Sequence, residues 1–470
     1  MQAGGQQPAS TLPRPTRTQT TGLTVGGLLF VLALLVDVPG LAPDGQRMLA
    51  IFLLAIVLWI TEAIPLVATA VLVILLQVLM LSSEAVLPVG ADALPASDYF
   101  ATLADPVIVL FLGGFLIAQG AAKFELDRNL AAVLLRPFAG SARATVLGLM
   151  AITALLSMFV SNTATTATMF AVVVPVLRAL PAGTARTGVA LSIPVAANVG
   201  GIGTPVGSPP NAIALGALAA RGESISFVAW MALALPLVVL VLAGAWWLLT
   251  RRFVPTGTPL TLELQASFDT RPAAMVFYAV AGATILLWLT EPFHGIASTT
   301  VGFVPVVALL ATQVMSGDDL RSIQWPVLWL VAGGIALGLG IGATDMDVWL
   351  LQLLAWDRLG HLLLVGLLAL TAVAFSTVIS SSAAANLLIP LALGIAFGVG
   401  ADAVLVAVVV AIACSLAMSL PISTPPNAIA YATGEVPTRA LGTTGLAVGA
   451  AGIGLLVLAM PPLWSLLGLP

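Results

Sequence analysis

Charged side chains are scarce in this chain. Asp, Glu, Lys and Arg make up 8% of its 470 residues, whereas 60% of the residues are apolar and the mean hydropathy is +1.12. A water-soluble globule of this length needs a far more polar surface. The composition therefore excludes a soluble protein and predicts an all-α polytopic membrane protein.

Cysteine and histidine are also nearly absent. Cys414 is the only cysteine, which excludes disulfides within the chain and thiolate metal clusters. The two histidines, His294 and His361, have no metal-ligand spacing, so no transition-metal site is expected. No Ser/His pair, paired aspartates or His/Glu metal arrangement lies at membrane depth, and we predict that the chain is not an enzyme.

Long apolar runs dominate what is present. A membrane span needs roughly 20 mostly apolar residues, and about eleven spans fit the sequence. They begin near residues 23, 47, 66, 106, 187, 226, 273, 300, 326, 402 and 443. Two further apolar stretches, 144–180 and 361–400, are interrupted by polar clusters and are predicted to be re-entrant helical hairpins. Residues 1–22 are polar and are predicted to form a flexible cytoplasmic tail.

The cationic residues predict the orientation in the bilayer. With the N-terminus in the cytoplasm, eleven spans and two hairpins, thirteen of the sixteen Lys and Arg residues fall inside. Only Arg47, Arg221 and Arg358 fall outside. This distribution follows the positive-inside rule and places the C-terminus outside. Trp59 and Trp288 are interpreted as anchors at the membrane interface.

The two halves of the chain are related by an internal repeat. Leu58–Glu62 matches Leu287–Glu291, Pro106-Val107 and Gly113-Gly114 match Pro326-Val327 and Gly333-Gly334, and Ser161 matches Ser380. Each half contains five spans and one hairpin, so the second half is expected to be inverted relative to the first. That is the plan of many secondary transporters. The paired glycines are expected to allow close helix packing.

Two Pro-Pro-Asn sequences, Pro209-Pro210-Asn211 and Pro425-Pro426-Asn427, lie 216 residues apart and interrupt apolar helices. Such breaks are tolerated only where they line a polar cavity or are buried in protein, and their free carbonyls and helix N-termini can hold ions. Upstream, the hairpin tips carry Ser161-Asn162-Thr163 and Ser380-Ser381-Ser382. Ser157 and Ser376, four residues before each tip, are expected on the same helical face as Ser161 and Ser380. Because tips and breaks lack Lys and Arg, bound Na⁺ is expected to balance an anionic substrate.

At these residues the chain resembles the divalent anion/sodium symporter family, which transports di- and tricarboxylates and sulfate. The most specific marks are Trp59–Pro65, Ser161–Thr163, Gly207–Asn211 and Ser423–Asn427. The resemblance implies a homodimer that works by an elevator mechanism. Its scaffold domain would comprise residues 23–137 and, with a connecting segment, 253–358. Its transport domain would comprise residues 138–252 and 359–470.

The resemblance also implies binding residues. One Na⁺ would lie among Ser157, Ser161, Asn162 and the carbonyl of Gly207, and a second among Ser376, Ile379, Ser381, Ser423 and Pro425. Substrate carboxylates would contact Asn162, Thr163, Ser208, Ser381, Ser382 and Thr424. Here Ser381 departs from the family pattern, which has Ser-Asn-Thr at both tips.

The predicted function is Na⁺-coupled symport of a dicarboxylate of the succinate, malate or fumarate class in the bacterial inner membrane. Na⁺ is the only cofactor, and neither an organic cofactor nor nucleic acid is expected. Because Ser381 removes an amide, three alternatives stay open: a dicarboxylate or citrate exchanger without net Na⁺ coupling, a sodium/sulfate symporter, and transport of a bulkier carboxylate. An anion channel is the alternative from another class, against which the repeated hairpins argue.

Overall fold

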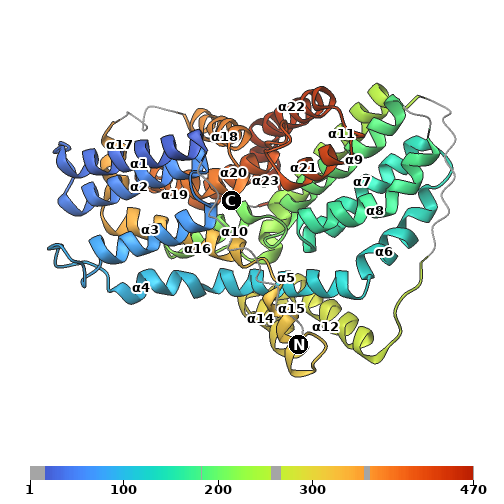
Figure 1. Ribbon diagram of the computed structural model, residues 1–470, viewed down its shortest axis with the longest axis horizontal. Coiled ribbons are helices and arrows are strands. Elements are labelled where there is room, and N and C mark those ends of the chain that lie inside the picture. Colours follow the sequence, from blue (N-terminus) through green and yellow to red (C-terminus); the bar gives the residue numbers. More distant parts are fainter. Residues whose placement is uncertain (1–15, 181–182, 256–265, 354–359, 469–470) are drawn as a thin grey trace, which may run out of the picture.

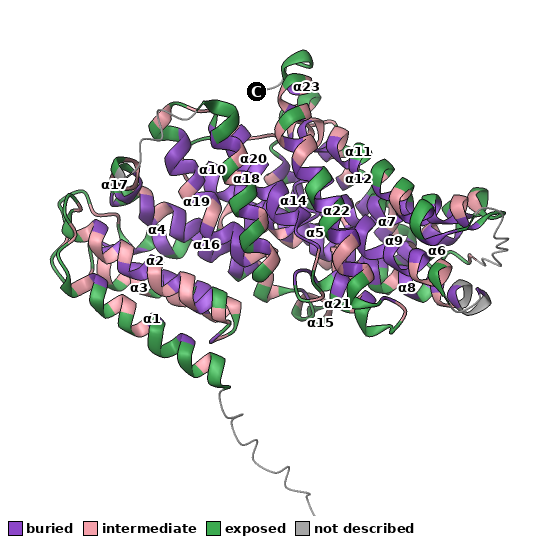
Figure 2. Cartoon of the chain, turned by 90° about the horizontal axis from the view of Figure 1, so that it is seen from above, coloured by how far each residue is buried: buried purple, intermediate pink, exposed green. Residues whose placement is uncertain are grey.

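The computed structural model describes residues 16–180, 183–255, 266–353 and 360–468 (Figure 1). Every regular element in these segments is helical, as the composition predicts. The central helices are buried over most of their length, whereas α1 (Arg17–Leu35) lies at the edge and exposes much of its surface (Figure 2).

The described part of the first half, to residue 253, contains eleven α-helices, α1 to α11, with three short 3₁₀ turns among them. The bounds are α2 (Pro43–Thr61), α3 (Leu66–Leu81), α4 (Ala96–Ala101), η1 (Thr102–Ala104), α5 (Pro106–Lys123), α6 (Leu126–Leu135), η2 (Arg136–Phe138), α7 (Ala142–Phe159), α8 (Asn162–Ala179), α9 (Thr184–Gly200), η3 (Gly201–Gly203), α10 (Pro209–Ala219) and α11 (Phe227–Phe253).

The second half of the described chain is helical as well. Its elements are α12 (Pro272–Leu289), α13 (Glu291–His294), α14 (Ser298–Ala311), α15 (Gly317–Arg321), α16 (Trp325–Ala343), α17 (Met346–Leu353), α18 (His361–Val378), α19 (Ser381–Val399), α20 (Ala403–Leu416), α21 (Pro425–Ala432), α22 (Thr438–Gly454), the π-helical turn η5 (Leu455–Ala459) and α23 (Met460–Leu466). Several helices begin with proline at one of their first two positions, where the missing N–H costs no hydrogen bond.

All eleven expected spans coincide with helices. Within the described residues, ten helices are long and apolar enough to cross a membrane, and seven of these are expected spans. The other three are hairpin arms, α7, α18 and α19, which length and composition alone do not distinguish from spans. The remaining expected spans fall on the shorter helices α3, α9, α14 and α20.

Both predicted hairpins consist of two helices separated by a two-residue break. The backbone turns at Val160 and at Ile379, which are extended, and the next helix begins at Asn162 or Ser381. Ser161 and Ser380 therefore cap the second arm of each hairpin through bonds from Ala164 N and Ala383 N. The expected hydroxyl ladder along one helical face is wrong, because the first arm ends before either serine.

The N-terminal tail is shorter than expected where the structure describes it. Helix α1 begins at Arg17, five residues before Gly22, because Thr16 and Gln19 form a capping box. Gly22 then packs closely against Thr61 and Ala63, and Gly26 against Leu54 of α2. Residues 1–15 and Arg358, which entered the predictions of the tail and of the orientation, lie outside the described residues.

The expectation that Trp59 and Trp288 anchor the protein at the interface is wrong. Both side chains are buried, and each indole donates to a backbone carbonyl at the start of the next long helix, Leu66 O or Ser298 O. Glu291 has a structural role, since its carboxylate accepts from Phe227 N and Ser298 N, the first amides of α11 and α14.

The paired glycines pack helices closely, as predicted. A Cβ atom at Gly113 would overlap the carbonyl oxygen of Gly302 in α14. At Gly334 it would overlap the side-chain oxygen of Asn386 in α19, whose Nδ2 donates to Leu330 O of α16 over 2.9 Å. These contacts hold α5 and α16, the long central helices of each half, against their neighbours.

Candidate functional site

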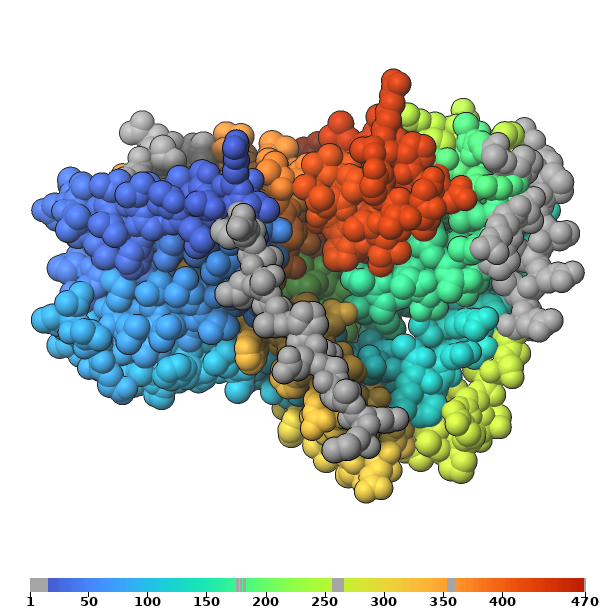
Figure 3. All heavy atoms as spheres, viewed as in Figure 1, coloured from blue at the N-terminus to red at the C-terminus, as the bar shows by residue number. Residues whose placement is uncertain are grey.

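A cavity of about 140 Å³ lies where the two hairpin tips meet the two broken helices. On the face shown in Figure 3, the orange-red C-terminal segment lies beside the green helices of the first half. All six residues predicted to bind substrate carboxylates line this cavity. The lining comprises Phe111, Phe115, Ser161, Asn162, Thr163, Asn198, Val206, Gly207, Ser208, Pro209, Gln324, Val327, Ser381, Ser382, Ser415, Thr424, Pro425 and Pro426.

Four helix N-termini open onto this cavity. Its lining includes the first residues of α8, α10, α19 and α21, together with the N-caps Ser208 and Thr424. Of the described residues that line it, none carries a charge. Each helix N-terminus bears about half a positive elementary charge, so the cavity is a neutral but electropositive site for an anion.

The Pro-Pro-Asn sequences begin helices rather than forming the breaks themselves. Pro209 and Pro425 are the first residues of α10 and α21, and the unwound segments are residues 204–208 and 417–424. The asparagines then bond back to these loops. Asn211 Nδ2 donates to Gly201 O and Thr204 O, and Asn427 Nδ2 donates to Met418 O and Leu420 O.

Oxygen atoms gather around Asn162 at the first hairpin tip. Its side-chain amide lies 2.5 Å from Ser157 Oγ, 3.1 Å from Gly207 O and 3.2 Å from Ala197 O. With its nitrogen turned toward them, the amide donates to these three oxygens. With its oxygen turned toward them, that oxygen accepts from Ser157 Oγ and faces the carbonyl oxygens of Gly207 and Ala197. Ser157, Asn162 and Gly207 are thus brought together as predicted, whereas Ser161 uses its hydroxyl as a helix cap.

The corresponding groups at the second tip are arranged differently. Ser376 Oγ donates to Cys414 O over 2.6 Å, and Ser423 Oγ donates to Thr377 O over 3.1 Å. Ser381, which corresponds to Asn162, lines the cavity but reaches none of these groups by a hydrogen bond. Ile379 ends the first arm of the second hairpin, and Pro425 begins α21 after the second break.

Several lining residues were not predicted from the sequence. Asn198 and Ser415 join the two halves, because Asn198 Nδ2 donates to Asn427 Oδ1 over 3.1 Å and Ser415 Oγ lies 3.4 Å from Ser208 Oγ. Gln324 and Phe111 come from the opposite wall, formed by α5 and the start of α16. Asn198 and Ser415 could have been found from the sequence, because each is a polar residue in the last apolar turn before a break.

The sequence matches the family described as citrate transporter over residues 56–413. It is similar to the sodium-dependent dicarboxylate transporter SdcS of Staphylococcus saprophyticus, with 29% identity over 94% of this chain and 91% of that protein. The SdcS protein of Staphylococcus aureus strain NCTC 8325 is also 29% identical, over 91% of this chain and 88% of its own length.

A similar fold occurs among solved structures. The Alcanivorax borkumensis YdaH transporter, whose crystal structure revealed an unusual topology, aligns with a TM-score of 0.54 and 15% identity. The alignment covers 97% of this chain and 99% of that one. At this identity the likeness concerns the fold alone.

Proposed function

This chain belongs to the citrate transporter family, and from that premise we propose that it carries a small carboxylate dianion across the membrane together with Na⁺. The observation that carries the proposal is the convergence of four helix N-termini on one uncharged cavity. Hydroxyl and amide groups from both tips and both breaks supply hydrogen-bond donors for carboxylate oxygens. The relatives named as sodium-dependent dicarboxylate transporters support the choice of ion and substrate class.

Na⁺ supplies the full positive charge that the cavity lining lacks. A helix N-terminus stabilises an anion by up to about 2 kcal/mol in a favourable buried geometry, which is much less than the cost of removing a dianion from water. The first Na⁺ would bind Ser157 Oγ, Asn162 Oδ1 and the carbonyls of Gly207 and Ala197, because Na⁺ replaces the donor that this oxygen cluster lacks.

The second Na⁺ would bind among Ser376, Ile379, Ser381, Ser423 and Pro425. Here Ser381 offers a hydroxyl where Asn162 offers an amide oxygen, so the two ion sites are unequal. A serine is also smaller than an asparagine, so it occupies less of the cavity that Ser382 and Thr424 line. This difference favours a second candidate function, the transport or exchange of a larger anion such as citrate.

An elevator mechanism fits the division into a scaffold domain, residues 23–137 and 253–358, and a transport domain, residues 138–252 and 359–470. Under this division the cavity lies at the domain boundary, since Phe111, Phe115, Gln324 and Val327 belong to the scaffold. The protein would act as a homodimer in the bacterial inner membrane, with the N-terminus in the cytoplasm and the C-terminus outside.

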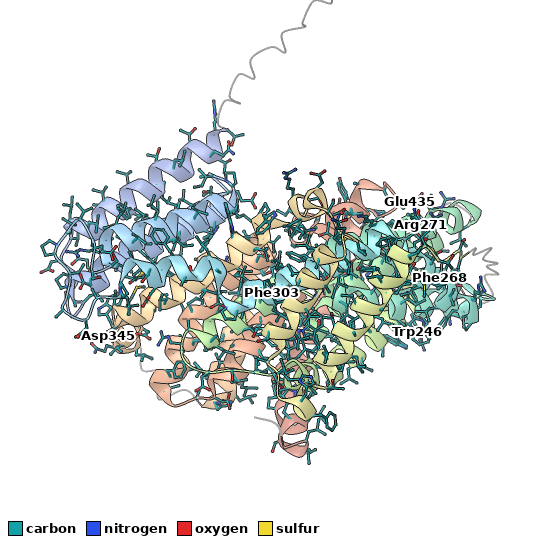
Figure 4. All side chains as sticks on the ribbon, turned by 90° about the horizontal axis from the view of Figure 1, so that it is seen from below. Trp246, Phe268, Arg271, Phe303, Asp345 and Glu435 are labelled. Atoms are coloured by element: carbon teal, nitrogen blue, oxygen red, sulfur yellow. The ribbon has the colours of Figure 1, made fainter. Side chains whose placement is uncertain are left out.

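The proposed inversion of the two halves is supported by where the broken helices end. The C-terminal end of α10 lies near Asp345, because Arg221, just after α10, pairs with Asp347. The C-terminal end of α21 lies near Glu435, which follows that helix. Figure 4 shows Asp345 and Glu435 near opposite ends of the molecule. Equivalent helix ends that point in opposite directions are expected of inverted repeats.

Uptake by proteoliposomes tests the proposal. Succinate, citrate and sulfate are offered to the purified protein with and without an inward Na⁺ gradient, and with each anion preloaded. We expect saturable succinate uptake that the Na⁺ gradient drives. Uptake that requires a preloaded anion and ignores the gradient identifies an exchanger, and flux without saturation or counterflow identifies a channel.

A further inference from the structure

Asn198 connects the last turn of α9 to the second broken helix. Its side chain is 2% exposed, and its Nδ2 donates to Asn427 Oδ1 over 3.1 Å, although 229 residues separate the two. Asn427 in turn donates through Nδ2 to Met418 O at 2.8 Å and Leu420 O at 3.0 Å. The Asn427 amide thereby uses both of its polar atoms and fixes residues 417–424.

The first break lacks this support. Asn211 holds its own loop through Gly201 O and Thr204 O in the same manner, but its buried Oδ1 has no partner within the described residues. Counting 216 residues onward from Asn198, the repeat places Cys414 at the corresponding position. A thiol is a weak donor, and Cys414 Sγ makes no hydrogen bond in the described part of the chain. From the other half, the first break is bonded within the described residues only by a hydroxyl, Ser415 Oγ at 3.4 Å from Ser208 Oγ, whereas the second break is held through the hydrogen bond between two Asn amides that organises the whole loop.

Asn198 also adjoins the first oxygen cluster. The carbonyl of the preceding residue, Ala197, accepts from Ser157 Oγ over 2.9 Å and lies 3.2 Å from the Asn162 amide. The Asn198 side chain lines the same cavity as Ser208 and Thr424. Two consecutive residues of α9 therefore serve both sites: the Ala197 carbonyl belongs to the first oxygen cluster, and the Asn198 side chain holds the second break.

We propose that Asn198 is a positioning residue that couples the two halves of the binding site. A shift of α9 at the first ion site moves the Asn198 amide, and with it Asn427 and the loop that carries Ser423 and Thr424. This inference rests on the proposed function, because the coupled ligands are Na⁺ and a carboxylate anion. Coupling of this kind makes binding at either half favour binding at the other.

The test replaces Asn198 by alanine in the full-length protein. Backbone hydrogen exchange, followed by mass spectrometry in lipid nanodiscs, is expected to become faster in residues 417–424 and to stay unchanged in residues 201–208. Loss of one hydrogen bond is worth about 1 kcal/mol, or about fivefold in an equilibrium constant. In proteoliposomes we therefore expect the Na⁺ concentration for half-maximal uptake to rise about fivefold, with a lower Hill coefficient for Na⁺.

Asn129→Ala is the matched control. Asn129 is another buried asparagine with two hydrogen bonds, to Glu125 O and from Ser267 N, and it lies on α6 rather than at a break. Its removal is expected to lower thermal stability without altering the Na⁺ dependence.

The outcomes separate this inference from the proposed function. Wild-type uptake that ignores Na⁺ overturns the proposed function, and the exchange measurement still decides whether Asn198 positions the second break. Unchanged exchange in residues 417–424 of Asn198→Ala overturns the inference even if wild-type uptake depends on Na⁺. Equal acceleration in both loops also overturns it, because a general loss of stability then explains the result.

Discussion

Arg221, just beyond α10, forms an ion pair with Asp347 in the first turn of α17. Nη2 of Arg221 lies 2.6 Å from Oδ2 of Asp347, and the two side chains are 20% and 9% exposed. The guanidinium also lies 5.7 Å from the ring centroid of Phe397 in α19. The pair thus joins three helices at one end of the molecule, where the sequence indicated only a cation outside the membrane.

Removing either partner of this pair should destabilise the protein. Asp347→Ala leaves a largely buried guanidinium unpaired, and we expect a loss of at least about 2 kcal/mol. The double variant Arg221→Ala/Asp347→Ala should lose less than the sum of the two single variants. Chemical unfolding in detergent measures the cycle, with the exposed Arg321–Asp318 pair as the control. Strict additivity would show that the contact has no energetic role.

Asn162→Ala should abolish Na⁺-dependent uptake while the protein remains folded. The substitution removes an amide that contacts Ser157 Oγ, Gly207 O and Ala197 O and also lines the anion cavity. Transport assays combined with size-exclusion profiles check this expectation. Thr250→Val, which removes a buried hydroxyl bonded within its own helix, is the control. Wild-type Na⁺ dependence in Asn162→Ala would refute the placement of the first ion site.

Ser381→Asn should strengthen Na⁺ binding. The longer side chain supplies an amide oxygen at the second tip where Asn162 supplies one at the first. We expect the Na⁺ concentration for half-maximal uptake to fall several-fold and the cooperativity for Na⁺ to rise. Titration of uptake with Na⁺ at fixed succinate measures both. A titration curve identical to that of the wild type would mean that Ser381 does not contact a cation.

Gln324 should contribute to substrate selection. Its exposed side chain is the only polar one that the wall of α5 and the start of α16 contributes to the lining of the cavity. An amide both donates and accepts, so Gln324→Ala should weaken binding of malate, with its hydroxyl, more than that of succinate, by about fivefold. Gln324→Glu places a negative charge opposite the anion and should weaken both. Competition against succinate uptake distinguishes these cases, and equal loss in Gln324→Ala would contradict the role in selection.

Asp319 should make stability depend on pH. Burial raises the pKa of its carboxyl. The hydrogen bonds from Lys123 Nζ, at 2.7 Å, and from Ser316 together outweigh that effect, so the pKa lies below the usual value. The stabilising contribution of Asp319 to the free energy of unfolding is therefore complete above the unfolded pKa of about 3.9. It disappears as the pH falls through the folded pKa.

The comparison of wild type with Asp319→Asn tests this sign. Near neutral pH we expect the variant to be less stable by about 1 kcal/mol, and the difference should shrink as the pH falls below about 4. Unfolding curves between pH 3 and 7 measure it. Asp318→Asn, at the neighbouring exposed carboxylate, should show almost no difference at any pH. A difference that grows on acidification would reverse the assigned direction of the pKa.

Much of the architecture follows from the sequence because the bilayer restricts the choice of backbone structure. Backbone groups must be paired within helices at membrane depth, so apolar length locates the helices and polar interruptions locate the tips. The pairing of Ser161 with Ser380, and of Asn211 with Asn427, follows from counting along the chain. The six residues that the family resemblance implied for substrate binding line one cavity.

Contacts between helices depended on the tertiary structure. Trp59 and Trp288 are of a residue type that commonly anchors proteins at the membrane interface, but neighbouring helices bury both side chains. Ser161 was expected to continue the helical face of Ser157, yet a two-residue break turns its hydroxyl to the amide of Ala164 in α8. Hydropathy and spacing describe one helix at a time and do not specify which side chain of a distant helix it meets.

The sequence by itself determined that this chain is a helical membrane protein with two hairpin tips and two broken helices, since those features depend on local composition and on the repeat. Only the tertiary structure decided that Asn198 reaches Asn427 and that Ala197 presents its carbonyl to Asn162. These contacts depend on how α8, α9 and α21 pack together, and interhelical packing is set by the shapes of all the contacting surfaces at once.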